Sequence, residues 1–184
     1  MAISLLNQTA YPATFQLYKG GLVLAVLPAI EPGAELVVPG ESIPYEITAE
    51  IILNGNRLIS APLPFDDSDN VRLLAQVVEQ LLDQTYVFNV IPGYPSELGQ
   101  LQLASSCSSD VLFRINSQGQ VMQTVLVTSA SAPVSLALDA TYGFTAVING
   151  ITIPPLTTTN SNATITAVTS TSGPDGEFFE LQIS

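Results

Sequence analysis

The chain has 184 residues, of which 47% are hydrophobic and only 11% charged, and its 16 acidic and four basic residues give a net charge of −12. The four bases (Lys19, Arg57, Arg72 and Arg114) are too few and too dispersed to bind a phosphate backbone or anionic lipid heads. The absence of histidine and the single cysteine, Cys107, exclude Ser-His-Asp and Cys-His catalysis, His- or thiolate-bound zinc and an intrachain disulfide. We therefore expect a non-catalytic protein without a cofactor, and neither nucleic acid nor a membrane span.

The first part of the chain reads as short strands separated by Gly and Pro turns. The predicted strands are Ile3 to Thr9, Ala13 to Tyr18, Leu22 to Leu27 and Ala34 to Val38. No apolar run approaches the roughly 20 residues that a membrane helix needs. The N-terminal stretch has no basic region followed by a long apolar core, so we see no signal peptide and expect synthesis in the cytoplasm.

A hairpin signal follows in the stretch Tyr45 to Gly55, which ends in Asn54-Gly55. Asn-Gly between alternating apolar residues favours a type I′ turn, because both central positions need a positive φ. A two-residue turn would place Leu53 opposite Asn56 and Ile51 opposite Leu58. The pattern therefore predicts an antiparallel pair with one apolar and one polar face.

The segment Val71 to Leu82 is ambiguous between a helix and a strand. Its leucines and valines fall at helical spacing, and Ser68 or Asp69 would be a good N-cap. Its counterpart later in the chain, Ala163 to Thr169, is rich in Thr and Val and therefore strand-like. We predict a strand here, then a turn near residues 82–84, then a strand from Tyr86 to Ile91.

The second part of the chain repeats the first. Ile3-Ser4-Leu5 recurs 98 positions later as Leu101-Gln102-Leu103, and the hairpin recurs in shortened form as Tyr142 to Gly150. The repeated strands are predicted at Leu101–Ser106, Val111–Asn116, Val121–Ser129, Val134–Leu138, Tyr142–Ile148, Ile151–Thr157, Ala163–Thr169 and Glu177–Ile183. Such a period indicates a duplicated unit.

The fold prediction is all-β: two tandem antiparallel β-sandwiches in residues 1–91 and 100–184, with a proline-containing linker at 92–99. Short strands at 8–12-residue spacing are typical of a sandwich, and the pattern resembles immunoglobulin-like modules in architecture. Tryptophan is absent and the Cys–Trp–Cys core is missing, so no particular family is indicated.

Few residues suggest a binding site. Asp66, Asp67 and Asp69 form an acidic loop that could hold calcium, although the EF-hand glycine and glutamate are lacking and a solvated loop is the simpler interpretation. Glu46 and Glu50 lie roughly 13 Å apart on one strand face, too far for a glycosidase pair. Six aromatic residues could stack on a sugar, but core packing is the commoner role: Tyr11, Phe15, Tyr18, Tyr86, Phe88 and Tyr94. We expect Cys107 to be a buried apolar residue on a strand.

The near absence of lysine suggests a function. Soluble sheet proteins protect their edge strands with charge, especially lysine, but Leu22–Leu27, Val121–Val127 and Thr164–Val168 carry none. The sequence therefore favours a self-associating structural or storage protein that forms a lattice, inclusion or fibre. The alternatives are a ligand-binding module, such as a lectin-like domain with a glycan ligand or a toxin-accessory sandwich, and a pore-forming protein with Val71 to Ile91 as its hairpin.

Overall fold

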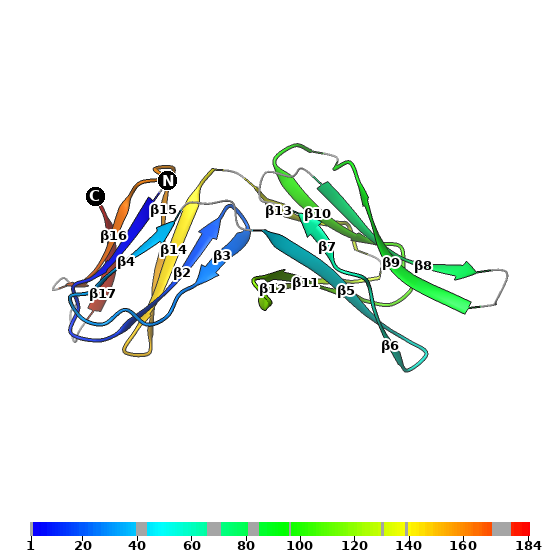
Figure 1. Ribbon diagram of the computed structural model, residues 1–184, viewed down its shortest axis with the longest axis horizontal. Helices are drawn as coiled ribbons and strands as arrows, with labels where there is room; N and C mark the ends of the chain where they lie inside the picture. Colours follow the sequence, from blue (N-terminus) through cyan, green and yellow to red (C-terminus); the bar gives the residue numbers. More distant parts are fainter. Residues whose placement is uncertain are drawn as a thin grey trace. The chain divides into compact units, whose positions relative to one another are not determined.

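A computed structural model shows that the protein is all-β (Figure 1). It describes residues 2–39, 44–65, 71–80, 85–95, 97–129, 131–138, 140–170 and 178–184, with the side chain of Gln80 left out. Seventeen strands and no helix occur within these ranges. The prediction of an all-β chain with several sheets is therefore confirmed.

The chain divides into two compact units, and each unit takes strands from both halves of the sequence. Unit 1 comprises Met1–Glu41 and Ala140–Ser184. Its strands are β1 (Ala2–Asn7), β2 (Ala13–Lys19), β3 (Leu22–Val26), β4 (Glu35–Pro39), β14 (Tyr142–Ile148), β15 (Ile151–Thr158), β16 (Thr164–Ser170) and β17 (Phe178–Ile183).

Unit 2 is the continuous middle of the chain, Ser42–Asp139. Its strands are β5 (Tyr45–Leu53), β6 (Asn56–Ile59), β7 (Leu63–Phe65), β8 (Val71–Gln80), β9 (Thr85–Gly93), β10 (Gln100–Ser105), β11 (Val111–Ser117), β12 (Gln120–Val127) and β13 (Val134–Ala137).

The two units have the same sheet topology. In unit 1 the sheets run β17-β16-β1-β4 and β15-β14-β2-β3, and in unit 2 they run β9-β8-β10-β13 and β6-β5-β11-β12, with β7 also paired to β5. Every strand of these orders thus has a counterpart at the same position in the other unit, and only β7 has none among the described strands. Within each unit the two sheets contact each other, for example through β15 and β17 or through β5 and β9.

Two parallel pairings join the halves of the sequence. In unit 1, β1 lies beside β16, and Figure 1 shows the blue and orange strands side by side; in unit 2, β10 lies beside β8. The compact units therefore differ from the predicted ranges 1–91 and 100–184, because the halves exchange strands. The predicted linker, 92–99, begins within β9 and lies inside unit 2, where it connects two strands of one sheet.

Both hairpins form as the sequence indicates. Asn54 and Asn149 have φ near 50°, and the glycine after each also has a positive φ. The register pairs Ile51 with Leu58 and Leu53 with Asn56, as predicted. The ambiguous segment is a strand, β8, as far as Gln80; the predicted turn at 82–84 and the end of the segment at Leu82 lie outside the described residues.

The core consists of alternate residues from the inner strands of each unit. Phe15 on β2 pairs with Ala146 on β14, and Phe113 on β11 pairs with Ala49 on β5. Both phenylalanines are fully buried, and each has a small residue opposite it. The two phenylalanines occupy equivalent positions because the sequence repeats. In both cases, however, the partner alanine comes from the other half of the sequence.

A buried asparagine fixes the loop between β1 and β2. Asn7 Nδ2 donates to the carbonyls of Tyr11 and Ile30, at 2.8 and 2.7 Å, and its Oδ1 accepts from the Thr9 backbone and hydroxyl. All the hydrogen-bonding capacity of this side chain is thus used inside unit 1.

Replacing this side chain should destabilise the protein. In an Asn7→Ala variant several buried groups lose their partners, each at about 1–3 kcal/mol, so we expect the free energy of unfolding to fall by about 3 kcal/mol. Urea unfolding measures this loss. Asn162→Ala is the control, since Asn162 is exposed, although it accepts from the Ala2 backbone; equal, small effects of both variants would contradict the role assigned to Asn7.

Candidate functional site: the uncharged sheet edges

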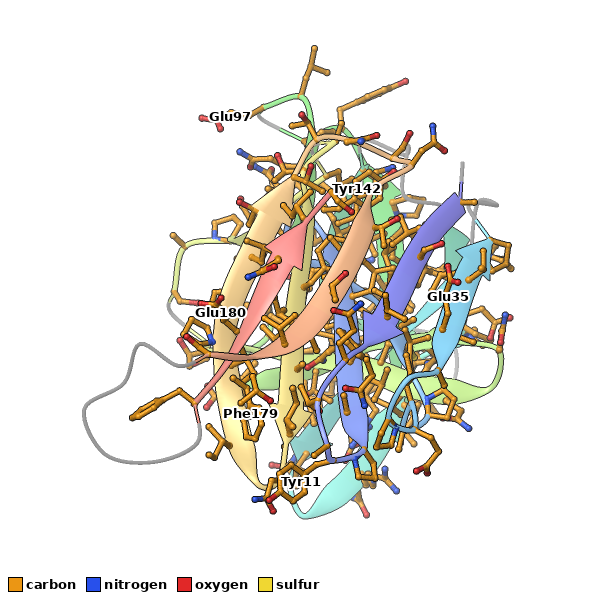
Figure 2. All side chains as sticks on the ribbon, turned by 90° about the vertical axis from the view of Figure 1, so that its left-hand side faces the viewer. Tyr11, Glu35, Glu97, Tyr142, Phe179 and Glu180 are labelled. Carbon is orange, nitrogen blue, oxygen red and sulfur yellow. The ribbon has the colours of Figure 1, made fainter. Side chains whose placement is uncertain are left out.

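Within the described residues, eight strands lie at the ends of the four sheet orders, and five of them contain no charged residue. The uncharged end strands are β3, β9, β12, β13 and β15. The other three carry one charge each, Glu35 on β4, Arg57 on β6 and Glu180 on β17; Figure 2 labels the two glutamates. The single lysine, Lys19, lies on the inner strand β2.

The sheet orders show which of the uncharged segments named in the sequence analysis lie at a sheet edge. Leu22–Leu27 and Val121–Val127 correspond to end strands, β3 and β12. Thr164–Val168 falls in β16, which lies between β17 and β1. Both sides of β16 are therefore paired, and its lack of charge exposes no sheet edge.

Most of the uncharged end strands have another protection against strand addition. Short length, proline and β-bulges all limit pairing with a further strand. β13 has four residues and β3 has five, β15 contains Pro154 and Pro155, and the pairing of β12 with β11 has a register shift at Ile115/Asn116. β9, in contrast, is nine residues long and has no proline or register shift before Pro92.

β9 is the longest uncharged end strand. It pairs with β8 without a register shift from Gln80↔Thr85 to Arg72↔Gly93. Phe88 and Val90 are buried on its inner face, whereas Val87 and Ile91 are 37% and 39% exposed. On the outer face Val87 lies opposite Val78 and Ile91 opposite Leu74, so this edge of the sheet is flanked by aliphatic side chains.

Asn89 is the polar exception on this outer face. It lies between Val87 and Ile91 along β9 and opposite Gln76 of β8. Its Oδ1 is buried and has no hydrogen-bond partner in the part of the chain that the structure describes. A buried acceptor without a donor is uncommon and calls for an explanation.

An electrostatic cluster surrounds Glu50, on the outer face of β5. Its carboxylate accepts hydrogen bonds from Arg57 on β6, at 2.6 and 2.8 Å, and from Arg114 on β11. The hydrogen bonds from Arg57 and then Arg114 lower the pKa of Glu50 to about 2, and the bond to Glu50 raises the pKa of Arg57. The cluster ties three neighbouring strands together.

The depressed pKa makes the contribution of Glu50 pH-dependent. A carboxyl whose pKa is lower in the folded than in the unfolded chain stabilises the fold above the unfolded pKa of about 4.3 and loses this effect toward pH 2. We expect Glu50→Gln to be less stable than wild type at pH 6, and the difference to disappear near pH 2. Urea unfolding across this range, at low protein concentration, measures it.

The matched control is Glu46→Gln, four residues earlier on the same face. It should change the free energy of unfolding by no more than about 0.5 kcal/mol, as is usual for surface substitutions. A stability difference between Glu50→Gln and wild type that persists unchanged at pH 2 would show that the carboxylate charge is not its cause.

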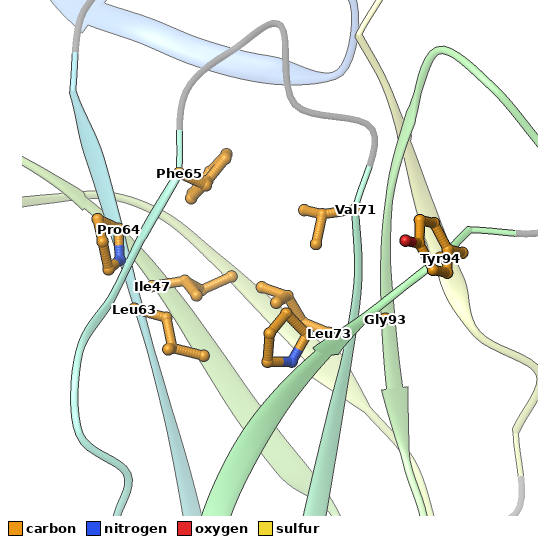
Figure 3. A pocket seen from close by; sticks show the side chains of 9 residues that line it. Ile47, Leu63, Pro64, Phe65, Val71, Leu73, Gly93 and Tyr94 are labelled. Carbon is orange, nitrogen blue, oxygen red and sulfur yellow. The ribbon is translucent and has the colours of Figure 1, made fainter.

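An apolar cleft of about 490 Å³ opens between the sheets of unit 2 (Figure 3). Its lining residues are Ile47, Leu63, Pro64, Phe65, Val71, Leu73, Pro92, Gly93 and Tyr94. The Tyr94 side chain is 96% exposed beside the cleft, and the other lining side chains are apolar.

The residues that the sequence suggested for a metal or thiol site do not form one site in the described structure. Asp66, Asp67 and Asp69 lie outside the described residues, so the calcium hypothesis stays a prediction. Within the described residues no three His, Cys, Asp or Glu side chains form a metal-binding group. Cys107 is buried as expected, but it follows β10 instead of lying on a strand, and its Sγ lies 3.7 Å from the carbonyl of Ala75.

The six aromatic candidates are divided between the two units. Tyr11, Phe15 and Tyr18 belong to unit 1, and Tyr86, Phe88 and Tyr94 to unit 2. Phe15 and Phe88 are buried, and the Tyr11 ring makes an edge-to-face contact with Phe179, seen in Figure 2, with ring centroids 5.9 Å apart. Neither unit therefore presents the platform of six rings that the sequence allowed.

Sequence reasoning missed Asn89 and half of the Glu50 cluster. The hairpin placed Arg57 on the same face as Glu50, so that contact could have been found. Arg114 comes from the other repeat, and no local pattern predicts its approach. Asn89 carried no signal, because its neighbours on the sheet were unknown.

Comparisons with known proteins give no relative: no family model, no curated protein and no solved structure matches this chain. Among the described residues, no helix has the length and apolar character to cross a membrane.

Proposed function

We propose that this chain is a non-catalytic, self-associating structural or storage protein that builds a lattice, inclusion or fibre. The observation that supports this function best is the set of uncharged end strands, five of the eight. An end strand presents unpaired backbone donors and acceptors, and charge is the usual means of preventing another chain from pairing there. The one lysine lies on an inner strand, and β9 has neither a charge nor another device that prevents pairing before Pro92, so this edge is open to other copies of the chain.

The composition of the surface supports the same function. Exposed positions on β15, β16 and β17 include Thr and Gln side chains, and short hydroxyl side chains lose little conformational freedom when they are covered. The net charge of −12 opposes random aggregation of these copies. Association would then be confined to contacts that bring no carboxylates together.

We also infer that the chain arose by duplication of an immunoglobulin-like sandwich whose halves now exchange strands. The equal topologies of the two units and the recurring hairpins support this origin. A duplicated and exchanged module suits a building block, because each unit presents an equivalent set of edges to neighbouring copies.

Sedimentation velocity tests the proposed function. The protein should form oligomers whose size grows with concentration at neutral pH, and should assemble further near its pI of about 4.1, where the acidic repulsion is smallest. A stable 19.4 kDa monomer at high concentration under both conditions would contradict self-association.

The apolar cleft supports a second candidate, a ligand-binding module. Its volume of about 490 Å³ falls within the range of small-molecule sites, and Tyr94 stands exposed beside it. Binding of a fluorescent apolar probe that is lost in Leu73→Gln but kept in the exposed-site variant Ile52→Gln would favour this function. A glycan array tests the lectin-like alternative, for which the cleft offers few polar side chains.

A further inference from the structure

We propose that two copies of the chain pair antiparallel through β9, with the twofold axis at Asn89. This inference rests on the proposed self-association and specifies one of its contacts. The partner is a second copy of this chain, and the pairing would join the β9-β8-β10-β13 sheets of two molecules into one continuous sheet.

The backbone of β9 is suited to such a pairing. The strand lies at the end of its sheet, so one side of its backbone is not paired within that sheet. Its register with β8 is unbroken over nine residue pairs, and the strand contains no charged residue. Two copies therefore place no like charges opposite each other in the paired strands, despite the large negative charge of the whole chain.

The side chains of β9 are complementary to themselves in this register. Around an antiparallel twofold axis at Asn89, Val87 of one copy lies opposite Ile91 of the second copy, and Phe88 lies opposite Val90. Val87 and Ile91 are the exposed aliphatic residues of the outer face, whereas Phe88 and Val90 belong to the inner face. Each face thus pairs apolar with apolar, and cross-strand pairs of this kind stabilise a sheet.

Asn89 favours a second copy of this chain over an unrelated strand as the partner of β9. In this register it lies opposite Asn89 of the second copy, with the two Cβ atoms about 5 Å apart. Rotation of the side chain brings each Oδ1, which is covered and without a donor within one chain, to the sheet edge, where the two carboxamides can donate to each other reciprocally. An unrelated apolar strand would leave this oxygen unpaired, and a shifted register would place Asn89 opposite an aliphatic residue.

Cysteine crosslinking of the full-length chain tests the pairing. In a Cys107→Ser background, Asn89→Cys should form a disulfide-linked dimer under mild oxidation, because directly opposite Cβ atoms lie close to disulfide distance. The matched control is Gln76→Cys, which lies beside Asn89 on the same face but one strand further in. Strand spacing would separate its two copies by roughly 14 Å, too far for a disulfide.

A second variant tests the same edge without crosslinking. Val87→Lys adds a charge at an exposed position of β9, and two such lysines in a dimer should raise its Kd at least roughly tenfold. Val37→Lys on the end strand β4, where Val37 is 54% exposed, is the control and should leave assembly unchanged.

The outcomes separate this inference from the proposed function. A linked dimer of Asn89→Cys without one of Gln76→Cys, together with weaker assembly of Val87→Lys, is the expected result. The β9 pairing would be overturned if both cysteine variants formed the linked dimer equally, or if neither formed it. Self-association would still stand in that case if the wild type assembled. A wild type that sediments as a monomer would remove both proposals.

Discussion

A chain cut once between Tyr94 and Gly99 should remain a single particle. This segment joins the two repeats, so two independent tandem sandwiches would separate after the cut. In the structure each compact unit contains strands from both sides of it: β1 pairs with β16, and β8 with β10. Separating the two fragments would expose the core faces of both units, so we expect no dissociation without denaturant.

The experiment uses a protease site inserted in residues 94–99, with complete cleavage verified in denaturing gels. Size-exclusion chromatography under native conditions should show both fragments eluting together at the position of the uncut protein, and urea should release them. The control carries the same site after Ala132, between β12 and β13. This cut falls inside a unit in both arrangements, so its two fragments should stay together in either case. Two separately eluting, folded fragments from the 94–99 cut would contradict the exchange of strands.

The second large effect is expected from Phe15→Ala. Phe15 is fully buried opposite Ala146, and truncating a buried phenylalanine costs about 3–5 kcal/mol. The loss should appear in unit 1. Amide exchange should therefore become faster in β14, which lies in the second repeat, and change little in β5, which belongs to the first repeat.

Phe113→Ala gives the reciprocal result. Phe113 is the equivalent residue of the second repeat, but it packs in unit 2 opposite Ala49. This variant should accelerate exchange in β5 and leave β14 nearly unchanged. Phe178→Ala, at a position 42% exposed on β17, controls for the loss of a phenyl ring and should cost much less. Effects confined to the repeat that contains each mutation would contradict the exchanged architecture.

The strands could be predicted from the sequence because their signals are local. Asn54-Gly55 and Asn149-Gly150 define their hairpins through positive φ, and apolar alternation defines the buried faces on either side. Even the ambiguous segment after Val71 was resolved, because its counterpart in the second repeat is rich in β-branched residues. For the hairpins and the buried faces the deciding residues lie within one turn or one strand, whereas the segment after Val71 needed the comparison with the other repeat.

The exchange of strands could not be predicted, since the repeats are equivalent. The strand β1 would bury the same faces against β8 of its own repeat as against β16 of the other, so the hydrophobic pattern is satisfied either way. The choice depends on how the chain leaves β4 and β13, which are the equivalent points where it passes between the units. Local residue patterns carry no information about which equivalent partner is taken.

The candidate site followed partly from the sequence. Scarcity of lysine pointed to open edges, and the end strands β3 and β12 were among those singled out. The longest uncharged edge, β9, was not singled out, because a strand's place at the end of a sheet depends on its distant neighbours. For the same reason Thr164–Val168 was wrongly taken as an open edge.

Amide exchange in β9 tests most directly whether this protein assembles through uncharged sheet edges. The rates are compared between dilute and concentrated wild type, with Val87→Lys at high concentration as the reference. Assembly through this edge predicts that the β9 amides exchange more slowly in concentrated wild type and return to the dilute rate in the variant. Identical β9 rates in all three samples, while the wild type sediments as a large particle, would contradict it.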